Sequence, residues 1–402
     1  MNWNGSAPRV LAYSHDGYGL GHLRRNVRIM SGLRKRIPEV DVLLVTGAKV
    51  ADRVVSRFGF NWLRLPAVSK VGKGRYEADE DGYSFVDVIR HRAVMIADAV
   101  RTFRPDVVLV DRYPRGLHNE LSPALEILRG ERDVSLVLGL RDILDDAHIV
   151  REEWDAAGYS RAIRELFRSV LIYGDPSVYD PVSQYQMPAD VADRTTFTGY
   201  LADDFVAVDA PEVRNRFARP GRRLVVSTFG GGKDAYGLAE TFLSAAGLLS
   251  VRGWDGLLVT GPYMSREDVA RLHAHPMANS IPIIEMVLDV PSHLAAADAV
   301  VCMGGYNTIC EVLALAVPAV TIPRTEPRQE QLMRCERFAA RGLISTLRPD
   351  RLSDVALADA VLTACKSERG ALGKRCDEIA RTGIEVASNH LASLLPVAVG
   401  SR

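Results

Sequence analysis

The sequence predicts an α/β protein with two domains, each formed by a parallel sheet covered by helices. Short apolar runs alternate with amphipathic stretches, which is typical of strand–helix–strand units. The alternation stops at a turn-rich segment after Asp175 and restarts near residue 221. The 402 residues also exceed the roughly 250 to 300 that a single hydrophobic core usually accommodates.

In the first half, the expected strands are Arg9–Ser14, Asp41–Thr46, Asp106–Asp111, Val134–Leu140 and Val170–Tyr173. Apolar residues at steps of three and four predict a helix over Leu23–Ile37. A second long helix is expected over Ser84–Phe103. Segment 66–83 is rich in glycine and charge, and long irregular segments of this kind are usually lids or disordered.

The second half begins after a strand-like segment at 195–199. Its expected strands are Leu224–Phe229, Gly256–Thr260, Ile281–Met286, Ala299–Met303 and Pro318–Pro323, and the tail Lys374–Pro396 is expected to be mainly helical. We therefore predict an N-terminal domain over 1–199, a linker over 200–220, a C-terminal domain over 221–375, and a C-terminal helix in 376–402 that packs back across the joint.

The composition is that of a folded protein without a strong electrostatic preference. Fifty Lys+Arg balance 50 Asp+Glu, so the formal net charge is +0 and a general attraction to nucleic acid is not expected. Five cysteines without a CxxC pair predict a reducing compartment and no structural zinc site. No signal sequence or long apolar run is recognisable, which predicts a cytoplasmic protein.

The strongest local signal is HDGYGLGHLRRN at 15–26, between the first strand and the first helix. Gly17, Gly19 and Gly21 permit a tight turn, and N–H groups at a helix start attract an anion or a developing oxyanion. The alternative is a glycine-rich connection without a ligand. A dinucleotide site is disfavoured, because GxGxG is not GxGxxG and the second strand ends at Gly47 without an acidic residue.

The helix that follows this loop is strongly basic. We expect its six basic residues to form either a solvated face or, as the minority interpretation, a contact to an anionic acceptor or a membrane surface. They are Arg24, Arg25, Arg28, Arg34, Lys35 and Arg36.

A second glycine-rich segment, STFGGGKDAYG at 227–237, follows the first strand of the second domain. A Walker A loop is not supported, because Ser227 stands at its first glycine and Asp234 follows Lys233. The segment is expected either to close on a phosphate, with Lys233 as a point charge, or to be a plain crossover turn.

The third signal lies at 289–342, where a strand leads into Gly304-Gly305 and a helix begins at Tyr306-Asn307-Thr308. Such a helix start can hold a diphosphate through backbone N–H groups and the Thr308 hydroxyl. Glu311 follows within the first turns, where a carboxylate can accept ribose hydroxyls. Glu330 and Gln331 open a later helix as an acid–amide pair suited to sugar hydroxyls.

These residues, with a strand ending in Pro323 between them, resemble the donor-binding signature of the GT-B glycosyltransferases, and most closely the MurG-like family 28. The loop at 15–26 is similar to that family's pattern GxGxGH, with His22 in the final position. The segment Gly230–Gly232 is similar to the glycine loop of the family's C-terminal domain. The resemblance covers both domains in order.

The resemblance implies two Rossmann-like domains facing across a cleft, with a nucleotide sugar, usually a UDP-sugar, in the second and the acceptor in the first. It implies that Leu288 contacts the base, Glu311 the ribose, and Glu330 with Gln331 the transferred sugar. The implied donor residues are Gly230, Gly231, Gly232, Lys233, Leu288, Gly304, Gly305, Asn307, Thr308, Glu311, Glu330 and Gln331. The acceptor-side candidates are His15, Gly17, Gly19, Gly21, Asp111 and Asp142.

Glycosyl transfer without a metal or other cofactor requires a base and charge stabilisation for the leaving diphosphate. His22 is the first candidate for the base and Asp16 the second, while His15, Asp111 and Asp142 are weaker ones. Aspartates at strand ends are as often helix caps as catalysts. Direct displacement predicts inversion at the anomeric carbon.

Two other functions remain open. A nucleotide-sugar epimerase or hydrolase would use the same donor residues without an acceptor, and a non-catalytic nucleotide-sugar-binding subunit would need a partner chain. The acceptor itself is either a small molecule or a lipid-linked one. The second case adds peripheral contact at the inner face of the membrane.

Overall fold

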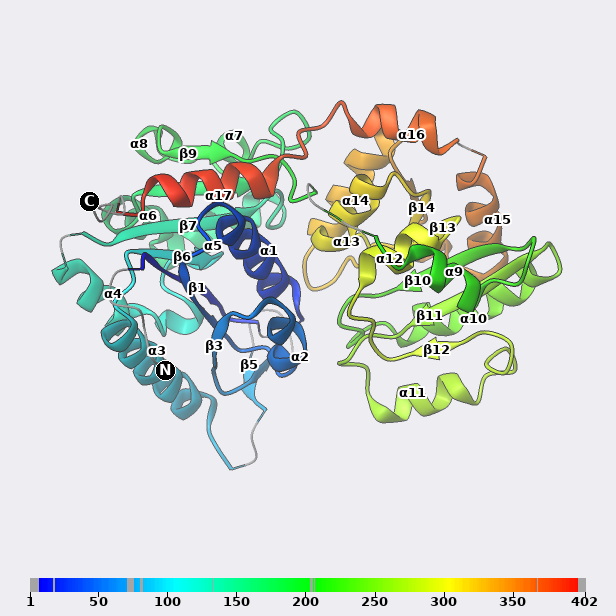
Figure 1. The fold of residues 1–402 in the computed structure, drawn as a ribbon, viewed down its shortest axis with the longest axis horizontal. Coiled ribbons are helices and arrows are strands. Elements are labelled where there is room, and N and C mark those ends of the chain that lie inside the picture. Colours follow the sequence, from blue (N-terminus) through cyan, green and yellow to red (C-terminus); the bar gives the residue numbers. More distant parts are fainter. Residues whose placement is uncertain are drawn as a thin grey trace. The chain divides into compact units, whose positions relative to one another are not determined.

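The computed structural model describes residues 7–16, 19–70, 76–79, 82–131, 133–202, 205, 207–366 and 368–396. The chain forms two compact units (Figure 1). Unit 1 comprises Met1–Leu201 and Thr382–Arg402, and unit 2 comprises Ala202–Arg381. Each unit contains a parallel sheet with helices around it, so the predicted α/β class is confirmed.

Unit 1 is built on a seven-stranded sheet with the strand order β3-β2-β1-β6-β7-β8-β9. Its neighbouring strands pair in parallel, with Leu11 of β1 opposite Leu43 of β2 and Val108 of β6. The apolar runs form the central strands because these are buried on both faces, whereas the edge strands β3 and β9 contain no buried residue. The strands are β1 (Arg9–Ser14), β2 (Asp41–Thr46), β3 (Asn61–Arg64), β6 (Val107–Asp111), β7 (Ser135–Arg141), β8 (Ser169–Tyr173) and β9 (Thr195–Phe197).

The helices of unit 1 connect these strands. The main ones are α1 (Gly21–Arg36), α3 (Phe85–Phe103), α4 (Ser122–Gly130), α5 (Ala147–Ala157) and α6 (Tyr159–Leu166). Shorter ones are α2 (Ala51–Val55), η1 (Ser56–Phe58), η2 (Leu117–Asn119), α7 (Pro181–Gln184) and α8 (Ala189–Ala192). The predicted helix over Leu23–Ile37 corresponds to α1, and the one over Ser84–Phe103 to α3, for which Ser84 is the N-cap.

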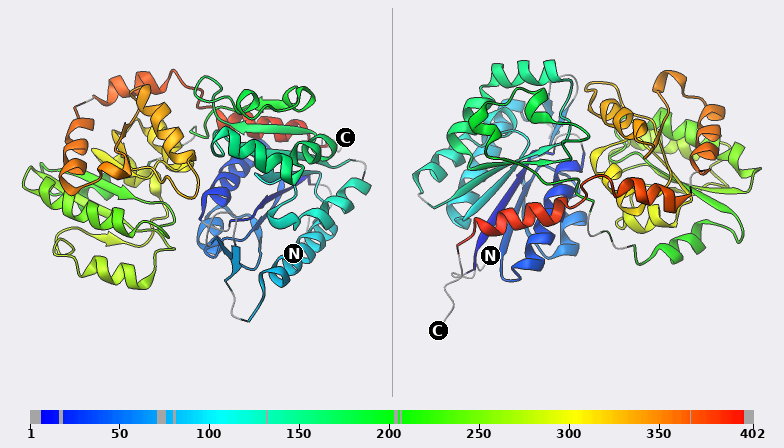
Figure 2. Two further views of the ribbon diagram at one scale, coloured as in Figure 1. Left: turned by 180° about the vertical axis from the view of Figure 1, so that it is seen from behind. Right: turned by 90° about the horizontal axis from the view of Figure 1, so that it is seen from above.

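The C-terminal helix α17 (Gly383–Ser393) belongs to unit 1 and lies beside α1 (Figures 1 and 2). The two helices approach closely at Gly32, where a Cβ would lie 2.5 Å from Cγ2 of Ile384. The Nε2 atom of His390 lies 2.7 Å from the Ser169 hydroxyl. The tail Lys374–Pro396, predicted to be mainly helical, contains the end of α16 (Arg369–Cys376) and the whole of α17. The first of these helices belongs to unit 2 and the second to unit 1.

The segment 66–83, expected to be a lid or disordered, contains regular structure in its described part. Its described residues include an antiparallel pair, β4 (Val68–Lys70) and β5 (Tyr76–Ala78). Val68 is buried against Val88 of α3 and Leu117. Buried apolar contacts of this kind fix a hairpin that its charged sequence does not reveal.

Unit 2 is built on a six-stranded sheet with the order β12-β11-β10-β13-β14-β15. Its strands are β10 (Arg223–Thr228), β11 (Trp254–Val259), β12 (Ile283–Ile284), β13 (Ala299–Cys302), β14 (Ala319–Thr321) and β15 (Ser345–Thr346). Its helices are α9 (Ala210–Phe217), α10 (Tyr236–Ser250), α11 (Arg266–His273), α12 (Val290–Ala296), α13 (Tyr306–Leu315), α14 (Glu330–Ala340), η3 (Pro349–Arg351), α15 (Asp354–Ala364) and α16.

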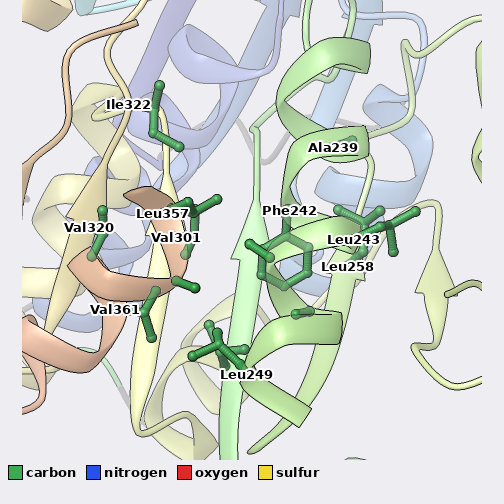
Figure 3. Close-up of a cluster of buried hydrophobic side chains, with 14 of the residues drawn as sticks. Ala239, Phe242, Leu243, Leu249, Leu258, Val301, Val320, Ile322, Leu357 and Val361 are labelled. Atoms are coloured by element: carbon green, nitrogen blue, oxygen red, sulfur yellow. The ribbon is translucent and has the colours of Figure 1, made fainter. Parts of the chain in front are cut away.

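The core of unit 2 fills the space between this sheet and helices α10 and α15 (Figure 3). Phe242 and Leu243 of α10 meet Leu258 of the sheet, and Leu357 and Val361 of α15 complete the cluster. All five are at most 1% exposed. This apolar layer holds the carboxyl ends of β10 and β13 in fixed positions.

The region expected to be a linker, 200–220, contains a helix that packs on unit 2. This is α9, from which Arg214 reaches Asp298 at 2.6 Å. Just before α9, the backbone N–H of Asp209 donates to the Ser292 hydroxyl at 3.1 Å. Most of the predicted linker therefore belongs to the second unit, which begins at Ala202.

Both sheets change the direction of their strand order at one point, between β1 and β6 in unit 1 and between β10 and β13 in unit 2. In open parallel sheets, ligands bind outside the carboxyl ends of the strands at such a point. The three glycine-rich segments of the sequence follow β1, β10 and β13. The topology thus directs attention to these segments and to Asp111, the last residue of β6.

Candidate active site

In unit 1, the loop after β1 is held by Asp16. The carboxylate of Asp16 accepts hydrogen bonds from the Thr46 hydroxyl at 2.6 Å and from the backbone N–H of Leu23 at 3.2 Å, and a third from the Ser14 hydroxyl. Its backbone φ is +41°, and the residue is 5% exposed. Three donors occupy this carboxylate, so its geometry suits fixing the start of α1 better than removing a proton.

Two glycines of this loop, Gly19 and Gly21, lie at the start of α1. Gly21 is the first residue of the helix, and a Cβ at Gly19 would meet open space. Gly17 lies outside the described residues. The N-cap residue Leu20 makes no side-chain hydrogen bond, and the first turn of α1 contains no acidic residue. The Asp16 carboxylate, from the loop before the helix, accepts the N–H of Leu23 and so satisfies one of the backbone donors at this helix start.

His22, Arg25 and Asp111 meet at the carboxyl end of β6. The Nδ1 atom of His22 lies 3.2 Å from Oδ1 of Asp111, and Nη2 of Arg25 lies 2.8 Å from Oδ2 of the same carboxylate. Arg25 is 2% and Asp111 0% exposed, whereas the His22 side chain is 15% exposed. The imidazole is thus the part of the cluster that a ligand can reach.

The charges in this cluster determine its protonation. Burial alone would raise the pKa of Asp111, but the charges of Arg25 and His22 and their hydrogen bonds outweigh it and lower the pKa to about 2. Burial lowers the pKa of His22, which Asp111 opposes and Arg25 reinforces. At neutral pH the cluster holds an ionised carboxylate and a neutral imidazole, which is the state a general base requires.

His15 lies beside His22, with ring centroids 4.5 Å apart, and is 5% exposed. Burial, followed by the charge of His22, lowers its pKa well below the usual value. Among the described residues, none forms a hydrogen bond with its Nδ1 atom. The neighbouring Tyr113 ring lies 5.0 Å from the His15 ring. His15 is therefore a neutral, buried imidazole behind His22.

Asp142 follows β7 and serves the local backbone. It accepts a hydrogen bond from the backbone N–H of Ile143 at 2.7 Å and one from the Tyr200 hydroxyl at 3.3 Å, and is 1% exposed. Of the two strand-end aspartates, Asp111 contacts His22. Asp142 has the geometry of a structural residue.

In unit 2, the glycine loop after β10 depends on backbone conformations that favour glycine. Gly230 and Gly232 have φ values of +65° and +85°. A Cβ at Gly232 would lie 2.1 Å from the Thr260 carbonyl oxygen, so no side chain fits there. The loop carbonyl of Gly231 accepts a hydrogen bond from the backbone N–H of Tyr263 at 2.8 Å. Lys233 follows on the exposed side of this loop.

The start of α13 is a second backbone site. Gly304 has a φ of +73°, and Gly305 is the N-cap, without a side-chain hydrogen bond and with open space where a Cβ would lie. The first turn of α13 contains no acidic residue. Asn307 is partly buried and Thr308 is 8% exposed. The dipole and N–H groups of this helix favour an anion such as a diphosphate.

The expected sugar and base contacts differ in exposure. Glu311 is 1%, Glu330 3% and Gln331 8% exposed, whereas Leu288 is 53% exposed. Little of the Glu311 carboxylate is therefore accessible to a ribose. Gln331 accepts a hydrogen bond from the backbone N–H of Arg324 at 3.1 Å.

Two arginines, one in each unit, were not expected to take part in the candidate sites. Arg324 reaches Asp234 at 3.1 Å and lies 3.6 Å from Glu330, so it joins the loop after β10 to the start of α14. Arg25 was counted with a solvated basic face, which is wrong because it is buried against Asp111. Its position three residues after His22 was the available signal, since residues three apart share a helix face.

Comparison with solved structures identifies the fold class of the chain. The calicheamicin glycosyltransferase CalG4 is similar in structure over 96% of this chain and 98% of its own, with a TM-score of 0.62 and 17% identity. MurG from Acinetobacter baumannii covers 96% of this chain and 99% of its own, with a TM-score of 0.55 and 14% identity. The chain has the fold of the GT-B glycosyltransferases.

Comparison with known sequences indicates which glycosyltransferases the chain is most similar to. Residues 225–375 match the glycosyltransferase family 28 C-terminal domain. The chain is 23% identical over 351 residues to the UDP-N-acetylglucosamine–N-acetylmuramyl-(pentapeptide) pyrophosphoryl-undecaprenol N-acetylglucosamine transferase of Limosilactobacillus fermentum, covering 85% of this chain and 86% of that protein. The transferase of the same name from Rhodococcus opacus is 32% identical over 33% of each chain. Residues 225–375 thus resemble a family 28 C-terminal domain, and the chain is similar to the MurG-type transferases along most of its length.

Two further properties of the described residues concern membranes and metal ions. In this part of the chain, no helix is both long and apolar enough to cross a bilayer. The same residues contain no group of three or more His, Cys, Asp or Glu side chains arranged to hold a metal ion.

Proposed function

We propose that the protein transfers a sugar from a UDP-sugar to a hydroxyl acceptor, with inversion and without a metal ion, and that His22 is the general base. The observation that carries the proposal is the contact between His22 and the ionised Asp111 at the strand-order reversal of unit 1. A neutral imidazole beside a fixed carboxylate accepts a proton readily, because the carboxylate stabilises the imidazolium that forms.

In the proposed reaction, Nε2 of His22 takes the proton of the acceptor hydroxyl while its oxygen attacks the anomeric carbon. The bond from that carbon to the diphosphate oxygen breaks, and the nucleoside diphosphate leaves with the electron pair. One displacement inverts the anomeric configuration. Asp111 holds the imidazole, and Asp16 holds the loop that precedes it.

The donor is proposed to bind unit 2. The start of α13, with Gly305 and Thr308, and the loop Gly230–Lys233 would stabilise the diphosphate, while Glu330 and Gln331 would contact the sugar. The family 28 match over residues 225–375 supports this placement. UDP-N-acetylglucosamine is the first donor to test, because the curated relative from Limosilactobacillus fermentum is named for it.

The acceptor is proposed to be lipid-linked, since the same relative's name contains pyrophosphoryl-undecaprenol. Such an acceptor would bring the protein to a membrane surface. The test supplies UDP-N-acetylglucosamine with an undecaprenyl-diphosphate acceptor or with soluble sugars and follows UDP release. Release only with a soluble acceptor would contradict the lipid-linked proposal.

The His22 assignment has its own test. His22→Gln should lower turnover by roughly 10²- to 10⁴-fold, because general base catalysis contributes about that much. Affinity for UDP, measured by calorimetry, should change little because the proposed donor residues lie in unit 2. His148→Gln, an exposed histidine of α5, is the control. Unchanged turnover in His22→Gln would remove His22 as the base.

An epimerase or hydrolase is the second candidate. A putative UDP-N-acetylglucosamine 2-epimerase from Listeria monocytogenes has the same fold, with a TM-score of 0.63 and 12% identity over 96% of this chain and 95% of its own. Incubation with UDP-N-acetylglucosamine alone separates the functions. A C2 epimer or free sugar formed without an acceptor would favour this candidate. UDP binding without any reaction would favour a binding subunit.

A further inference from the structure

Arg25 has no role in the proposed reaction so far, although its position is unusual. It lies on α1 three residues after His22 and is 2% exposed. Its Nε and Nη2 atoms lie 3.1 and 2.8 Å from Oδ2 of Asp111. Its Nη2 also lies 2.8 Å from Nδ1 of His22. One guanidinium thus contacts both the base and the carboxylate that holds it.

These contacts place two competing partners at a single nitrogen. Nδ1 of His22 lies 2.8 Å from the Arg25 donor and 3.2 Å from the Asp111 acceptor. A neutral imidazole nitrogen either carries a proton and donates, or has a lone pair and accepts. Nδ1 can therefore satisfy Arg25 or Asp111, but not both.

The two arrangements differ in chemistry. When Nδ1 donates to Asp111, the proton-free nitrogen is Nε2, and His22 can act as a base. When Nδ1 accepts from Arg25, Nε2 carries the proton, and His22 cannot take another there. The shorter contact to Arg25 favours the second arrangement.

We propose that Arg25 is a positioning residue that competes with Asp111 for Nδ1 of His22 and so determines which ring nitrogen carries the proton. The guanidinium also neutralises Asp111, which weakens the pull of that carboxylate on an imidazolium. Arg25 thereby keeps His22 neutral and limits the fraction of chains in which it is a competent base. This role rests on the proposed function of His22.

The surroundings of His22 leave Arg25 and Asp111 as its nearest charged partners. The charge of Asp16, in the loop after β1, affects the pKa of His22 less than the charges of Asp111 and Arg25 do. His15, in the same loop, remains neutral because its own pKa is lowered. The hydroxyl of Tyr173, on β8, is buried, and the charge of Asp111 helps to raise its pKa. An arginine does not lose its proton in proteins. His22 is thus the member of the cluster whose proton can move.

The test reads the His22 ring directly by NMR of the full chain labelled with ¹⁵N-histidine. The ring ¹⁵N shifts distinguish protonated from unprotonated nitrogens, and His22→Gln assigns the signals. Arg25→Met should increase the Nδ1–H fraction and raise the pKa of His22, with about a tenfold gain in proton affinity. Arg25→Lys should do the same to a smaller extent, because an ammonium lacks the planar fork.

Arg92→Lys is the matched control, because Arg92 is also buried and paired, with Glu120 in the same unit, and contacts the His15 carbonyl rather than the His22 ring. It should leave the His22 tautomer unchanged. If Arg25→Met does not fold, as judged by near-UV circular dichroism, the tautomer and the pKa of His22 are measured in Arg25→Lys instead.

An unchanged tautomer and pKa of His22 in a folded Arg25 variant would overturn the proposal. The NMR result is independent of catalysis. If the wild-type chain transfers no sugar, the proposed function fails while the tautomer reading still stands. If it does transfer sugar, the acid limb of kcat/KM should move to higher pH in Arg25→Lys along with the pKa of His22.

Discussion

Each unit has a candidate ligand site where the order of its strands reverses, but the two sites are formed by different chemical groups. In unit 1, the site at the carboxyl ends of β1 and β6 is formed by side chains. These are the two histidines His15 and His22 and the pair of Arg25 with Asp111, both of which are at most 2% exposed. In unit 2 the ends of β10 and β13 carry glycines with positive φ and a helix start without a side-chain cap. Side chains can move protons, and backbone N–H groups hold an anion without changing charge.

The difference has a physical consequence for tolerance to mutation. A buried ion pair in unit 1 is sensitive to the loss of either partner, because the other charge stays in a low-dielectric interior. A glycine site in unit 2 is sensitive to any added side chain, because the backbone conformation and the space both exclude it. Four substitutions, from the largest expected effect to the smallest, test this contrast.

The largest effect is expected for Arg92→Met in unit 1. Arg92 and Glu120 are both 0% exposed, and Nε of Arg92 lies 2.5 Å from the Glu120 carboxylate. Removing the guanidinium leaves a buried carboxylate, which typically costs about 3 to 5 kcal/mol of unfolding free energy. Urea denaturation measures the unfolding free energy, with Lys49→Met as the control, because the Lys49 side chain is 53% exposed although its partner Asp79 is partly buried. A similar loss in both variants would contradict the role of burial.

The second effect is expected for Gly304→Ala in unit 2. A Cβ there would lie 2.1 Å from the Cys335 sulfur, and φ is +73°. The left-handed conformation costs about 1 to 2 kcal/mol and overpacking about 1 to 3 kcal/mol.

Gly305→Ala is the matched control for that substitution, because Gly305 has a φ of −60° and open space. It should change stability little but weaken UDP binding, as its methyl group would lie at the start of α13. Equal stability losses in the two alanine variants would show that conformation at this junction does not matter.

A smaller effect is expected for Lys233→Ala. If Lys233 contacts the diphosphate, removing its charge should weaken UDP binding by about tenfold and reduce the salt dependence of binding. Lys374→Ala, an exposed lysine of α16, makes the same change in net charge and should not alter the affinity. Titration calorimetry at two salt concentrations measures both, and equal affinities for Lys233→Ala and wild type would assign diphosphate binding to the backbone alone.

The smallest effect concerns acid stability. His15 and His22 have lowered pKa values in the folded chain, so below about pH 6.5 the unfolded chain binds more protons and stability falls with falling pH. Each histidine contributes at most about 1.4 kcal/mol per pH unit. His15→Asn should therefore flatten the decline between pH 6.5 and 5, measured by urea denaturation. A decline as steep as in the wild type would show that His15 is not neutral when folded.

Much of the fold was predictable because strands and helices are encoded locally. The apolar runs predicted β1 and β2 with the bounds that the structure has, and the period of Leu23–Ile37 predicted α1. The short strand β3 (Asn61–Arg64) was missed because none of its residues is buried. The hairpin of β4 and β5 was missed because its stability comes from Val88 and Leu117, which are distant in the sequence.

The candidate site was predictable in part. The glycine-rich junctions were recognisable, and the structure places His22 and the start of α13 at the strand-order reversals. The charge state of the site was not predictable. Asp16, considered as a base, is occupied by three donors, and Asp111 proved to be the partner of His22.

The sequence by itself determined two parallel sheets and the glycines that permit their junctions, because periodicity and φ preferences act over a few residues. The tertiary structure alone decided which charges are buried and with which partner. Arg25 is basic and lies on a basic helix, yet it pairs with a carboxylate 86 residues away. The cost of burying a charge depends on what surrounds it in space, and no local pattern records that.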